Sequence, residues 1–279
     1  MSLQKYSVLM SVYAKEKPEF LRESMMSMYE QTVPTDDFVL ICDGPLNEGL
    51  DSVINEMSRL FGGRLRVFRF SENRGLGYAL KFGVEKCKNE LIARMDSDDV
   101  SVKDRCEKEL GGFEKNSDLA VVGSNIVEYD EKMKKTLGVR EVPETDEEIR
   151  KYAKRRNPMN HMSVMFKKSK VLKAGNYQDM PGFEDYYLWV RMMQNGCRFL
   201  NVQRPLMMVR GGSEMMRRRG GIQYIRRNAV FQKSLRKLNI TNTFTMVLNC
   251  LARTTIALVP RQFREVFYQR VLRKKNESC

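Results

Sequence analysis

ELIARMDSDD, residues 90–99, changes within one short stretch from an apolar run to a cluster of aspartates. The run from Glu90 to Asp96 has the length and composition of a buried strand, and ligands of open α/β sheets bind at the carboxyl ends of such strands. Because Asp96 and Asp98 stand at alternate positions there, their carboxylates can hold a hard divalent cation, which neutralises a diphosphate. The alternative is an acidic turn or the cap of a following helix.

Three further apolar runs precede this stretch, at residues 6–13, 38–43 and 64–70. Amphipathic helical stretches separate the runs, the first with Pro18 near its start and the third opening at Gly75. Short strands that alternate with helices form crossover units. The sequence therefore predicts an α/β fold with a mostly parallel central sheet flanked by helices.

Polar side chains follow each of the four predicted strands, namely Tyr13, Asp43, Arg74 with its neighbour Asn73, and Asp96. Since the carboxyl ends of parallel strands lie at one edge of a sheet, these residues should meet there. Asn73 and Arg74 also open a helix, where backbone N–H groups and a guanidinium can hold an anion. Taken singly, Asp43 or the glycines after Arg74 could serve an ordinary turn. Their convergence indicates a ligand site.

The elements after Val121 are shorter and mixed, which indicates an α+β second half. We expect a hairpin over residues 126–139, a strand over 161–166 and a helix over 183–195. RGGSEMMRRRGG, residues 210–221, then predicts a flexible basic joint before a helical C-terminal segment. The expected divisions of the chain are residues 1–120, 121–210 and 211–279.

A second acidic pair, Glu184-Asp185, opens the predicted helix in this half. Carboxylates at a helix N-terminus are ordinary capping electrostatics. Beside a separate metal and phosphate site, however, one of them could act as a base, because transfer to a hydroxyl needs a group that takes the proton. His161, the single histidine, is more typical of a neutral hydrogen-bonding residue than of a proton carrier. Trp189 lies one helical turn after Asp185, and we expect it in the core rather than in the wall of an acceptor site.

The composition is that of a soluble globular protein. The 279 residues are 42% hydrophobic and 30% charged, which excludes a disordered chain. Six scattered cysteines form no CxxC pair, so a zinc site or a disulfide framework is not expected, and free thiols favour a reducing cytoplasm. The N-terminus leads directly into the first predicted strand without a signal-peptide pattern.

Positive charge is concentrated in the last quarter of the chain. Lys and Arg number 49 against 35 Asp and Glu, giving +14, and residues 211–279 contain 15 basic and 3 acidic residues. The apolar run at residues 243–259 is interrupted by Asn249 and Arg253 and is shorter than the roughly 20 residues of a bilayer span. We therefore expect an amphipathic segment, followed by cations from Arg261 onward. This segment would lie on an anionic membrane surface or, alternatively, pack on the preceding domain.

Six segments together resemble an inverting glycosyltransferase of family 2, with the type A nucleotide-sugar-binding fold. The resemblance covers roughly residues 5–210. It implies a catalytic domain over residues 1–210, with a nucleotide-binding half and an acceptor half, and a basic helical extension after it. The segments, in the family's order and spacing, are SVLMSVY (7–13), ICDG (41–44), SENRGLGYAL (71–80), ARMDSDD (93–99), NPMNHMSVMF (157–166) and GFEDYYLWVRM (182–192).

The resemblance also implies roles for the candidate residues. Asp98 would ligate Mn²⁺ or Mg²⁺ on the donor diphosphate, and Asp185 would be the general base, with Glu184 and His161 the next candidates. His161 would more often position sugar hydroxyls, in the segment that lines the sugar side of the cleft. The residues implied to bind the donor or line its pocket are Tyr13, Asp43, Asn73, Arg74, Asp96, Asp98, His161 and Glu184.

The implied reaction is the transfer of one sugar, with inversion, from a nucleotide-sugar donor to a saccharide hydroxyl. Uridine diphosphate is the family's commonest donor nucleotide. The resemblance also implies a lipid-linked acceptor and a bacterial capsule or surface-polysaccharide pathway. It implies a peripheral location on the inner face of the cell membrane as well. Processive members carry a QxxRW motif, whereas here Arg227 stands in place of the tryptophan in the run that begins at Gln223. We therefore expect one sugar to be added per encounter.

Two other functions would share some of these features. A nucleotidyltransferase could use the same fold and metal carboxylates, but it does not need the Glu184-Asp185 pair. A basic nucleic-acid-binding protein without enzymatic activity would explain the charged C-terminal segment, but not the aspartates after the apolar strand. We expect no nucleic-acid partner. Pyrophosphate release from a nucleoside triphosphate would favour the first function, and salt-sensitive binding to random duplex DNA the second.

Overall fold

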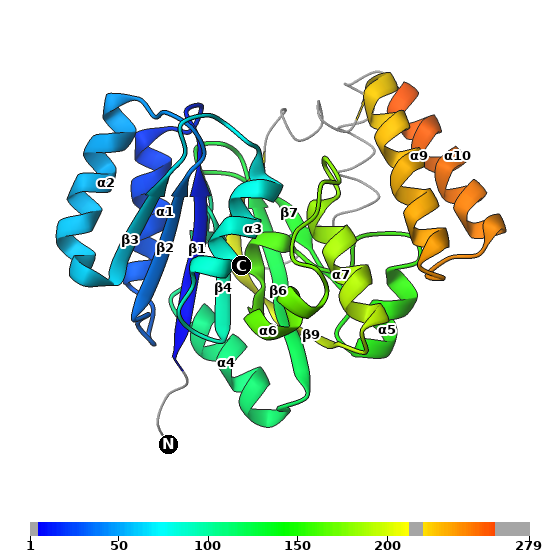
Figure 1. Cartoon of the computed structure of the whole chain (residues 1–279), viewed down its shortest axis with the longest axis horizontal. Coiled ribbons are helices and arrows are strands. Elements are labelled where there is room, and N and C mark those ends of the chain that lie inside the picture. Colours follow the sequence, from blue (N-terminus) through cyan, green and yellow to red (C-terminus); the bar gives the residue numbers. More distant parts are fainter. Residues whose placement is uncertain (1–4, 212–219, 260–279) are drawn as a thin grey trace.

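The computed structural model describes residues 5–211 and 220–259, which are built around one nine-stranded sheet (Figure 1). Its strands in chain order are β1 (Tyr6–Val12), β2 (Asp37–Cys42), β3 (Leu65–Arg69), β4 (Leu91–Asp96), β5 (Val100–Ser101), β6 (Leu119–Tyr129), β7 (Thr136–Arg140), β8 (Met165–Lys167) and β9 (Arg198–Arg210). Their order in space is β3-β2-β1-β4-β8-β6-β9-β5, with β7 paired to β6. The predicted α/β fold with a central sheet is confirmed.

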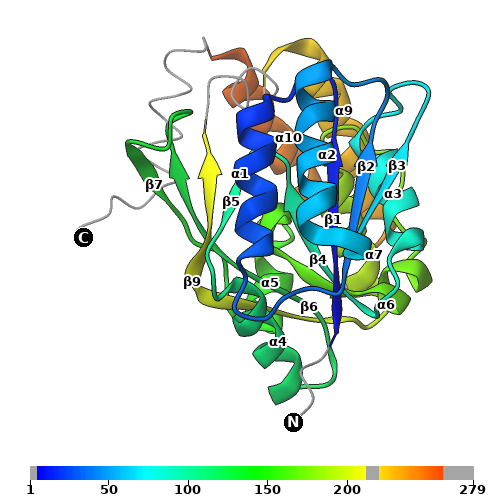
Figure 2. The same cartoon turned by 90° about the vertical axis from the view of Figure 1, so that its left-hand side faces the viewer.

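The first four strands are parallel neighbours, as the alternation of strands and helices predicts. Side chains alternate across β1, so Val8 and Met10 face one side of the sheet and Leu9 the other. Figure 2 shows α1 and α2 together over the first side; α3 and α7 supply buried residues to the second. The helices are α1 (Pro18–Tyr29), α2 (Glu48–Phe61), α3 (Leu76–Lys86), α4 (Arg105–Lys115), α5 (Asp146–Tyr152), α6 (Lys168–Lys173), α7 (Glu184–Gln194), α9 (Gly221–Lys237) and α10 (Thr243–Leu258).

The second half of the sheet is mixed. β6 and β7 form the predicted hairpin, while β8 joins β4 to β6 by antiparallel pairing on both sides. The expected strand over residues 161–166 is corrected: His161–Ser163 form a 3-10 turn, which the Ser163 N–H closes by donating to the Asn160 carbonyl oxygen (2.9 Å), and β8 begins only at Met165. β9, thirteen residues long, was not predicted from the sequence.

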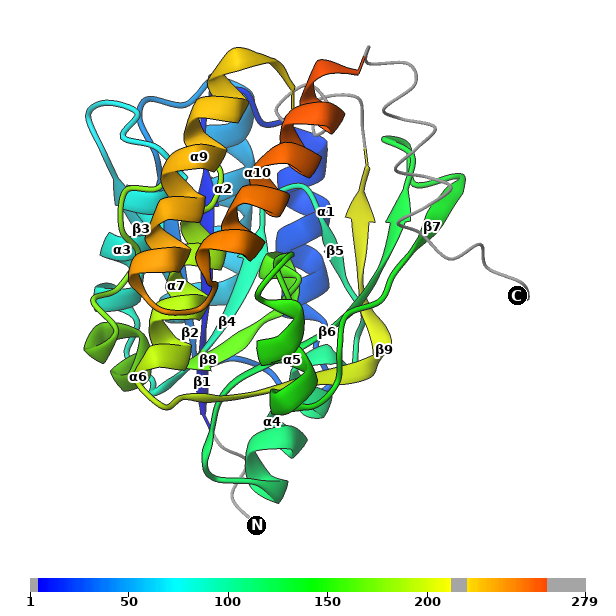
Figure 3. The same ribbon diagram turned by 90° about the vertical axis from the view of Figure 1, so that its right-hand side faces the viewer.

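α9 and α10 pack against each other and against the second half of the sheet domain (Figure 3). The main anchor is Phe231 of α9, whose ring stacks on Phe183 at a centroid distance of 4.6 Å. Within the described ranges, every helix is too short or too polar to cross a membrane. The predicted basic joint falls mainly on residues 212–219, and the cations from Arg261 onward fall on residues 260–279. Both segments lie outside the described residues.

Candidate active site

The carboxyl ends of the parallel strands bring separate loops to one edge of the sheet, as predicted. Ser11 of β1 lies in register with Asp96 of β4. The backbone N–H of Asp43 donates to the carbonyl oxygen of Val12 (2.8 Å). Asp43, Asp96 and the exposed Tyr13 therefore follow neighbouring strands. This edge is where ligands of parallel sheets bind.

Asp43 organises the loop between β3 and α3. Its carboxylate accepts hydrogen bonds from the backbone N–H groups of Arg74 (2.7 Å) and Gly75 (3.0 Å), at the start of α3. The Asn73 side chain donates to the Asp43 carbonyl oxygen (3.1 Å). At Gly44 the backbone has φ +94°, and a Cβ atom there would lie only 2.8 Å from the Asn73 nitrogen. The structure thus brings Asp43, Asn73 and Arg74 together through backbone contacts that require the glycine.

Arg74 extends from this loop across an aromatic ring. Its guanidinium lies 3.6 Å from the ring centroid of Tyr78 and donates to the Tyr78 hydroxyl (2.5 Å). Both side chains are exposed. Tyr78 was not among the residues singled out from the sequence; it lies in the first turn of α3, and Arg74 reaches it from the loop just before the helix. The pair presents a cation and a flat ring at the sheet edge, where Tyr13 is exposed as well.

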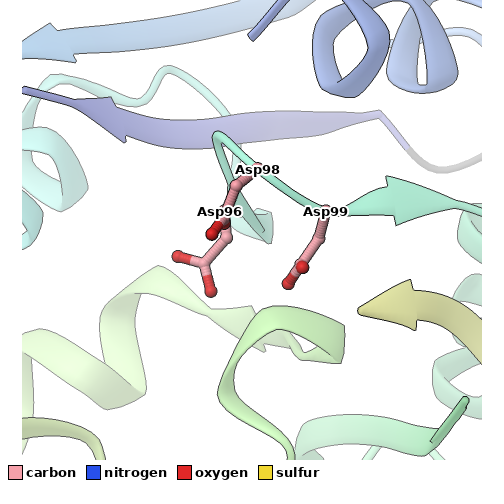
Figure 4. A group of neighbouring side chains, drawn as sticks. All are labelled: Asp96, Asp98 and Asp99. Carbon is pink, nitrogen blue, oxygen red and sulfur yellow. The ribbon is translucent and has the colours of Figure 1, made fainter. Parts of the chain in front are cut away.

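Three carboxylates gather after β4 (Figure 4). Oxygens of Asp96, Asp98 and Asp99 all lie within 4.8 Å of one another. Burial, together with the charges of Asp96 and Glu16, raises the pKa of Asp98 to about 7. Burial also raises the pKa of Asp99, which belongs to the predicted aspartate cluster but was given no role from the sequence. The cluster therefore carries negative charge that its surroundings do not fully compensate, and its oxygens are the ligands that hard divalent cations prefer.

Arg94 lies beneath this cluster and pairs with Asp96. The side chain is 1% exposed, and its Nε and Nη1 atoms have no hydrogen-bond partner among the described residues. A buried guanidinium with free donors keeps a strong electrostatic effect on its neighbours, because little water screens it. Sequence reasoning did not select Arg94, although a charged residue inside an otherwise apolar strand is a visible signal.

Arg210, the last residue of β9, fastens the aspartate loop to α1. Its backbone N–H donates to Asp99 (3.0 Å), and its guanidinium donates to the Asp98 carbonyl oxygen and to Glu23. The guanidinium also lies 4.2 Å from the ring centroid of Phe20. Nothing local in the sequence pointed to Arg210, because its partners are more than a hundred residues away along the chain.

The second acidic group stands at the N-terminus of α7, as predicted. Asp185 accepts a hydrogen bond from the Asn157 side chain (2.5 Å), and burial raises the pKa of its carboxyl. Burial also raises the pKa of Glu184. The Glu184 side chain packs at Gly77, where a Cβ atom would come within 3.2 Å of its Cγ. The start of α7 therefore lies against the start of α3, on the same side of the sheet as the Asp43 loop.

His161 pairs with another protein side chain. Its Nε2 lies 2.8 Å from the Tyr177 hydroxyl, and burial together with the positive charge of Arg94 holds its pKa well below the usual range. The imidazole is therefore neutral at physiological pH, as predicted. Trp189 packs edge-on beside it and is 0% exposed, which confirms the assignment of Trp189 to the core.

Arg94 and Tyr177 connect the two acidic groups. The charge of Arg94 acts on Asp98 and also on Asp185. The pKa of Tyr177 is raised by burial first, and then by the charges of Asp185 and Asp96. Both carboxylate groups thus lie within electrostatic range of the same buried side chains. This is the arrangement that a reaction with one anionic leaving group and one departing proton requires.

Comparisons with known proteins agree with this geometry. The chain is 36% identical over 265 residues to the amylovoran biosynthesis glycosyltransferase AmsE of Erwinia amylovora, covering 95% of this chain and 98% of that one. It is 35% identical over 270 residues to an Escherichia coli enzyme, UDP-Gal:alpha-D-GlcNAc-diphosphoundecaprenol beta-1,3-galactosyltransferase, covering 97% of each chain.

A solved structure supports the type A fold. The crystal structure of S. aureus TarS 1-349 in complex with UDP-GlcNAc matches with a TM-score of 0.65 at 16% identity, covering 96% of this chain and 76% of that one. The family model described as glycosyl transferase family 2 matches residues 7–173. The chain therefore belongs to glycosyltransferase family 2 and is a glycosyltransferase.

Proposed function

We propose that the enzyme transfers one sugar, with inversion, from a UDP-sugar to a hydroxyl of a saccharide acceptor. The observation that carries the proposal is the pair of acidic groups, Asp96-Asp98-Asp99 and Asp185, linked through Arg94. The aspartate cluster is suited to bind the metal and diphosphate of a donor, and Asp185 is suited to accept a proton. We also propose that residues 1–210 are the catalytic domain and residues 211–279 a helical extension.

The donor nucleoside is assigned to the loop that Asp43 organises. Arg74 offers a cation, while Tyr13 and Tyr78 offer exposed rings at the same sheet edge. Asn73 holds the loop beneath them, and Asp96 is assigned to the nucleoside side of the donor. Uridine is proposed because the E. coli relative is named for UDP-Gal and the TarS structure contains UDP-GlcNAc.

The aspartate cluster fits a divalent metal. Three carboxylate oxygens within 4.8 Å form an all-oxygen donor set. Burial, and after it the charges of Asp96 and Glu16, raises the pKa of Asp98, and a bound cation would offset both effects. Asp98, supported by Asp96 and Asp99, would hold Mn²⁺ or Mg²⁺. When bound, the metal supplies charge neutralisation for the diphosphate leaving group.

Asp185 would act on the acceptor. Its carboxylate takes the proton of the acceptor hydroxyl while that oxygen forms a bond to the anomeric carbon of the donor. The bond from this carbon to the diphosphate oxygen breaks at the same time, and its electron pair leaves on the nucleoside diphosphate. A pKa raised by burial makes Asp185 a better base than an exposed aspartate, and Asn157 fixes one of its oxygens. Glu184 and His161 are assigned to the sugar pocket beside it.

The acceptor is proposed to be a lipid-linked saccharide in bacterial surface-polysaccharide synthesis, presented at the inner face of the cell membrane. The name of the E. coli relative specifies a GlcNAc joined to diphosphoundecaprenol. In the run that starts at Gln223, Arg227 replaces the tryptophan of processive relatives, so a single addition is proposed.

The decisive experiment is a screen of UDP-sugars that measures UDP release with Mn²⁺, with and without a GlcNAc-diphosphate-lipid acceptor. The proposal predicts acceptor-dependent release of UDP from one sugar donor, and a product of inverted anomeric configuration by NMR. Release that is equally fast without any acceptor, or a product that retains the donor's configuration, contradicts it.

A further inference from the structure

The helix α10 is amphipathic, but its polar side faces the protein. The Asn249 side chain donates to the carbonyl oxygen of Lys154 (2.9 Å) and to the side chain of Gln232 in α9 (3.1 Å). The Arg253 guanidinium donates to the carbonyl oxygen of Arg155 (3.0 Å). The two polar residues that interrupt this apolar stretch are therefore used for docking α10 onto the domain. Both are only partly exposed, whereas the polar side of an ordinary surface helix faces solvent.

The apolar side of α10 is exposed instead. Ala257 is the only residue of α10 that is buried. Of the five large exposed residues, three follow Phe244 by three, four and seven positions, and Leu258 follows Leu251 by seven, so they form one stripe along the helix. We call this set the α10 stripe: Phe244 (72% exposed), Val247 (46%), Leu248 (48%), Leu251 (60%) and Leu258 (67%). A contiguous exposed apolar surface of this kind marks an interaction site in a soluble protein.

Charge beside the α10 stripe is of one sign. Residues 220–259 contain six Lys and Arg residues and no Asp or Glu. On α9, an exposed face combines cations with two exposed aliphatic side chains, Ile222 and Val230. The exposed cations of α9 are Arg226, Arg227, Lys233, Arg236 and Lys237. The two helices thus combine an apolar face with cations and contain no acidic side chain of their own.

These charges decide between two possible occupants. A second copy of the chain, packed helix to helix, would bring two segments of six cations each close together, and like charges oppose such contact. A bilayer rich in anionic lipid supplies an apolar layer for the stripe and negative headgroups for the cations. Since no described helix can cross a membrane, α10 would lie parallel to the surface.

We propose that the α10 stripe inserts among the lipids of an anionic membrane, while the α9 cations contact the headgroups. The proposal rests on the proposed function in one respect, since a lipid-linked acceptor would be presented at that surface. Vesicle binding can nevertheless be measured without donor or acceptor. A chain that binds vesicles but transfers no sugar would contradict the proposed function alone, and a chain that transfers sugar but ignores vesicles would contradict this inference alone.

The test is co-sedimentation of the full chain with vesicles of phosphatidylcholine, with and without phosphatidylglycerol. The double variant Leu248→Gln/Leu251→Gln should lower partitioning onto phosphatidylglycerol-rich vesicles at least tenfold. Lys233→Gln/Lys237→Gln should lower it severalfold and flatten its salt dependence, because fewer cations contact the headgroups. Leu60→Gln, which alters an exposed leucine of α2 (39% exposed), should bind as the parent does. Circular dichroism and thermal melting verify that each variant is folded.

Several results would overturn the proposal. One is a parent chain that does not bind anionic vesicles, and another is a folded Leu248→Gln/Leu251→Gln variant that binds them as tightly as the parent. A third comes from sedimentation equilibrium: a parent dimer that the same variant dissociates would assign the α10 stripe to a second copy of the chain.

Discussion

The carboxyl edge of the sheet and the outer side of α10 depart in opposite directions from the usual distribution of side chains. At the sheet edge, charged groups are buried: Arg94 is 1% exposed and Asp99 2%. On α10, large apolar groups are exposed, with Phe244 at 72%. Burying charge costs free energy unless the groups are paired, and exposing apolar surface costs free energy unless something covers it.

The difference lies in how each cost is met. The charges at the sheet edge have partners within the chain, as in the contacts of Asp96 with Arg94 and of Asp185 with Asn157, although two donors of Arg94 stay unpaired among the described residues. The α10 stripe has no such internal partner among the described residues, and the partner proposed for it is an anionic membrane. On this proposal the first region is organised for chemistry and the second for association.

The largest expected effect comes from the isosteric change Asp185→Asn. An amide cannot take the acceptor's proton at neutral pH, so transfer should fall by at least about 10²-fold, the lower end of what a general base supplies. UDP affinity should stay within about threefold, because the donor contacts lie elsewhere. Steady-state kinetics and calorimetry measure the two quantities. Asp179→Asn, at an exposed carboxylate in the loop that precedes α7, is the control. Near-normal transfer by a folded Asp185→Asn variant would move the base to Glu184 or His161.

Asp98→Asn tests the other acidic group. Removing one charged ligand should weaken Mn²⁺-dependent binding of UDP at least about tenfold, since loss of even an outer partner of a metal costs 10–100-fold in affinity. Calorimetric titration of UDP with and without Mn²⁺ gives the comparison. Asp118→Asn, whose side chain is 75% exposed, should bind UDP as the parent does. If Asp98→Asn binds UDP and Mn²⁺ as tightly as the parent, the metal assignment is wrong.

Arg94 tests whether the two acidic groups are coupled. Burial raises the pKa of Asp185, and the positive charge of Arg94 opposes that rise. Arg94→Met removes the charge, so the pKa of Asp185 should rise further and the acidic limb of the kcat/KM profile should move to higher pH. Arg94→Lys keeps a charge but not the guanidinium geometry, so it should restore the position of this limb while transfer remains about tenfold low. Identical pH profiles for Arg94→Met and the parent would mean that the groups act independently.

The sequence predicted the parts of the site that follow from local pattern. The strands β1, β2 and β4 are mostly apolar runs, so their ends, and with them Asp43 and Asp96, could be placed at one edge. Asp185 could be placed because it opens a helix.

The rest depends on contacts that no local pattern encodes. Arg210 contacts Asp99 from the end of β9. The sequence of β9 contains Asn201 and Pro205, which are unusual in strands, so its full length could not be predicted. The periodicity of α10 predicts two faces but not which of them packs inward. Here the backbone carbonyl groups of Lys154 and Arg155, far away in the sequence, decide that the polar face does.

The smallest expected effect concerns the backbone of the sheet edge. If this edge is organised before ligands bind, then disturbing its turn should affect both stability and donor binding. A Cβ atom at Gly44 would lie 2.8 Å from the Asn73 nitrogen, at a φ of +94° that other residues rarely adopt. Gly44→Ala should therefore lower the free energy of unfolding by about 1–3 kcal/mol. UDP should bind severalfold more weakly, because the Asp43 contacts to Arg74 and Gly75 must shift.

Gly63→Ala is the matched control, since a Cβ atom there would meet nothing within 4 Å. Its stability should stay within about 0.5 kcal/mol of the parent, as for most surface changes. Urea denaturation measures the stability of both variants, and calorimetry measures UDP binding. If Gly44→Ala loses stability but binds UDP as the parent does, the Asp43 loop is only a structural turn, and the donor nucleoside must be sought elsewhere along the sheet edge. If it loses neither, the turn tolerates a side chain, and the edge is less firmly organised than its hydrogen bonds indicate.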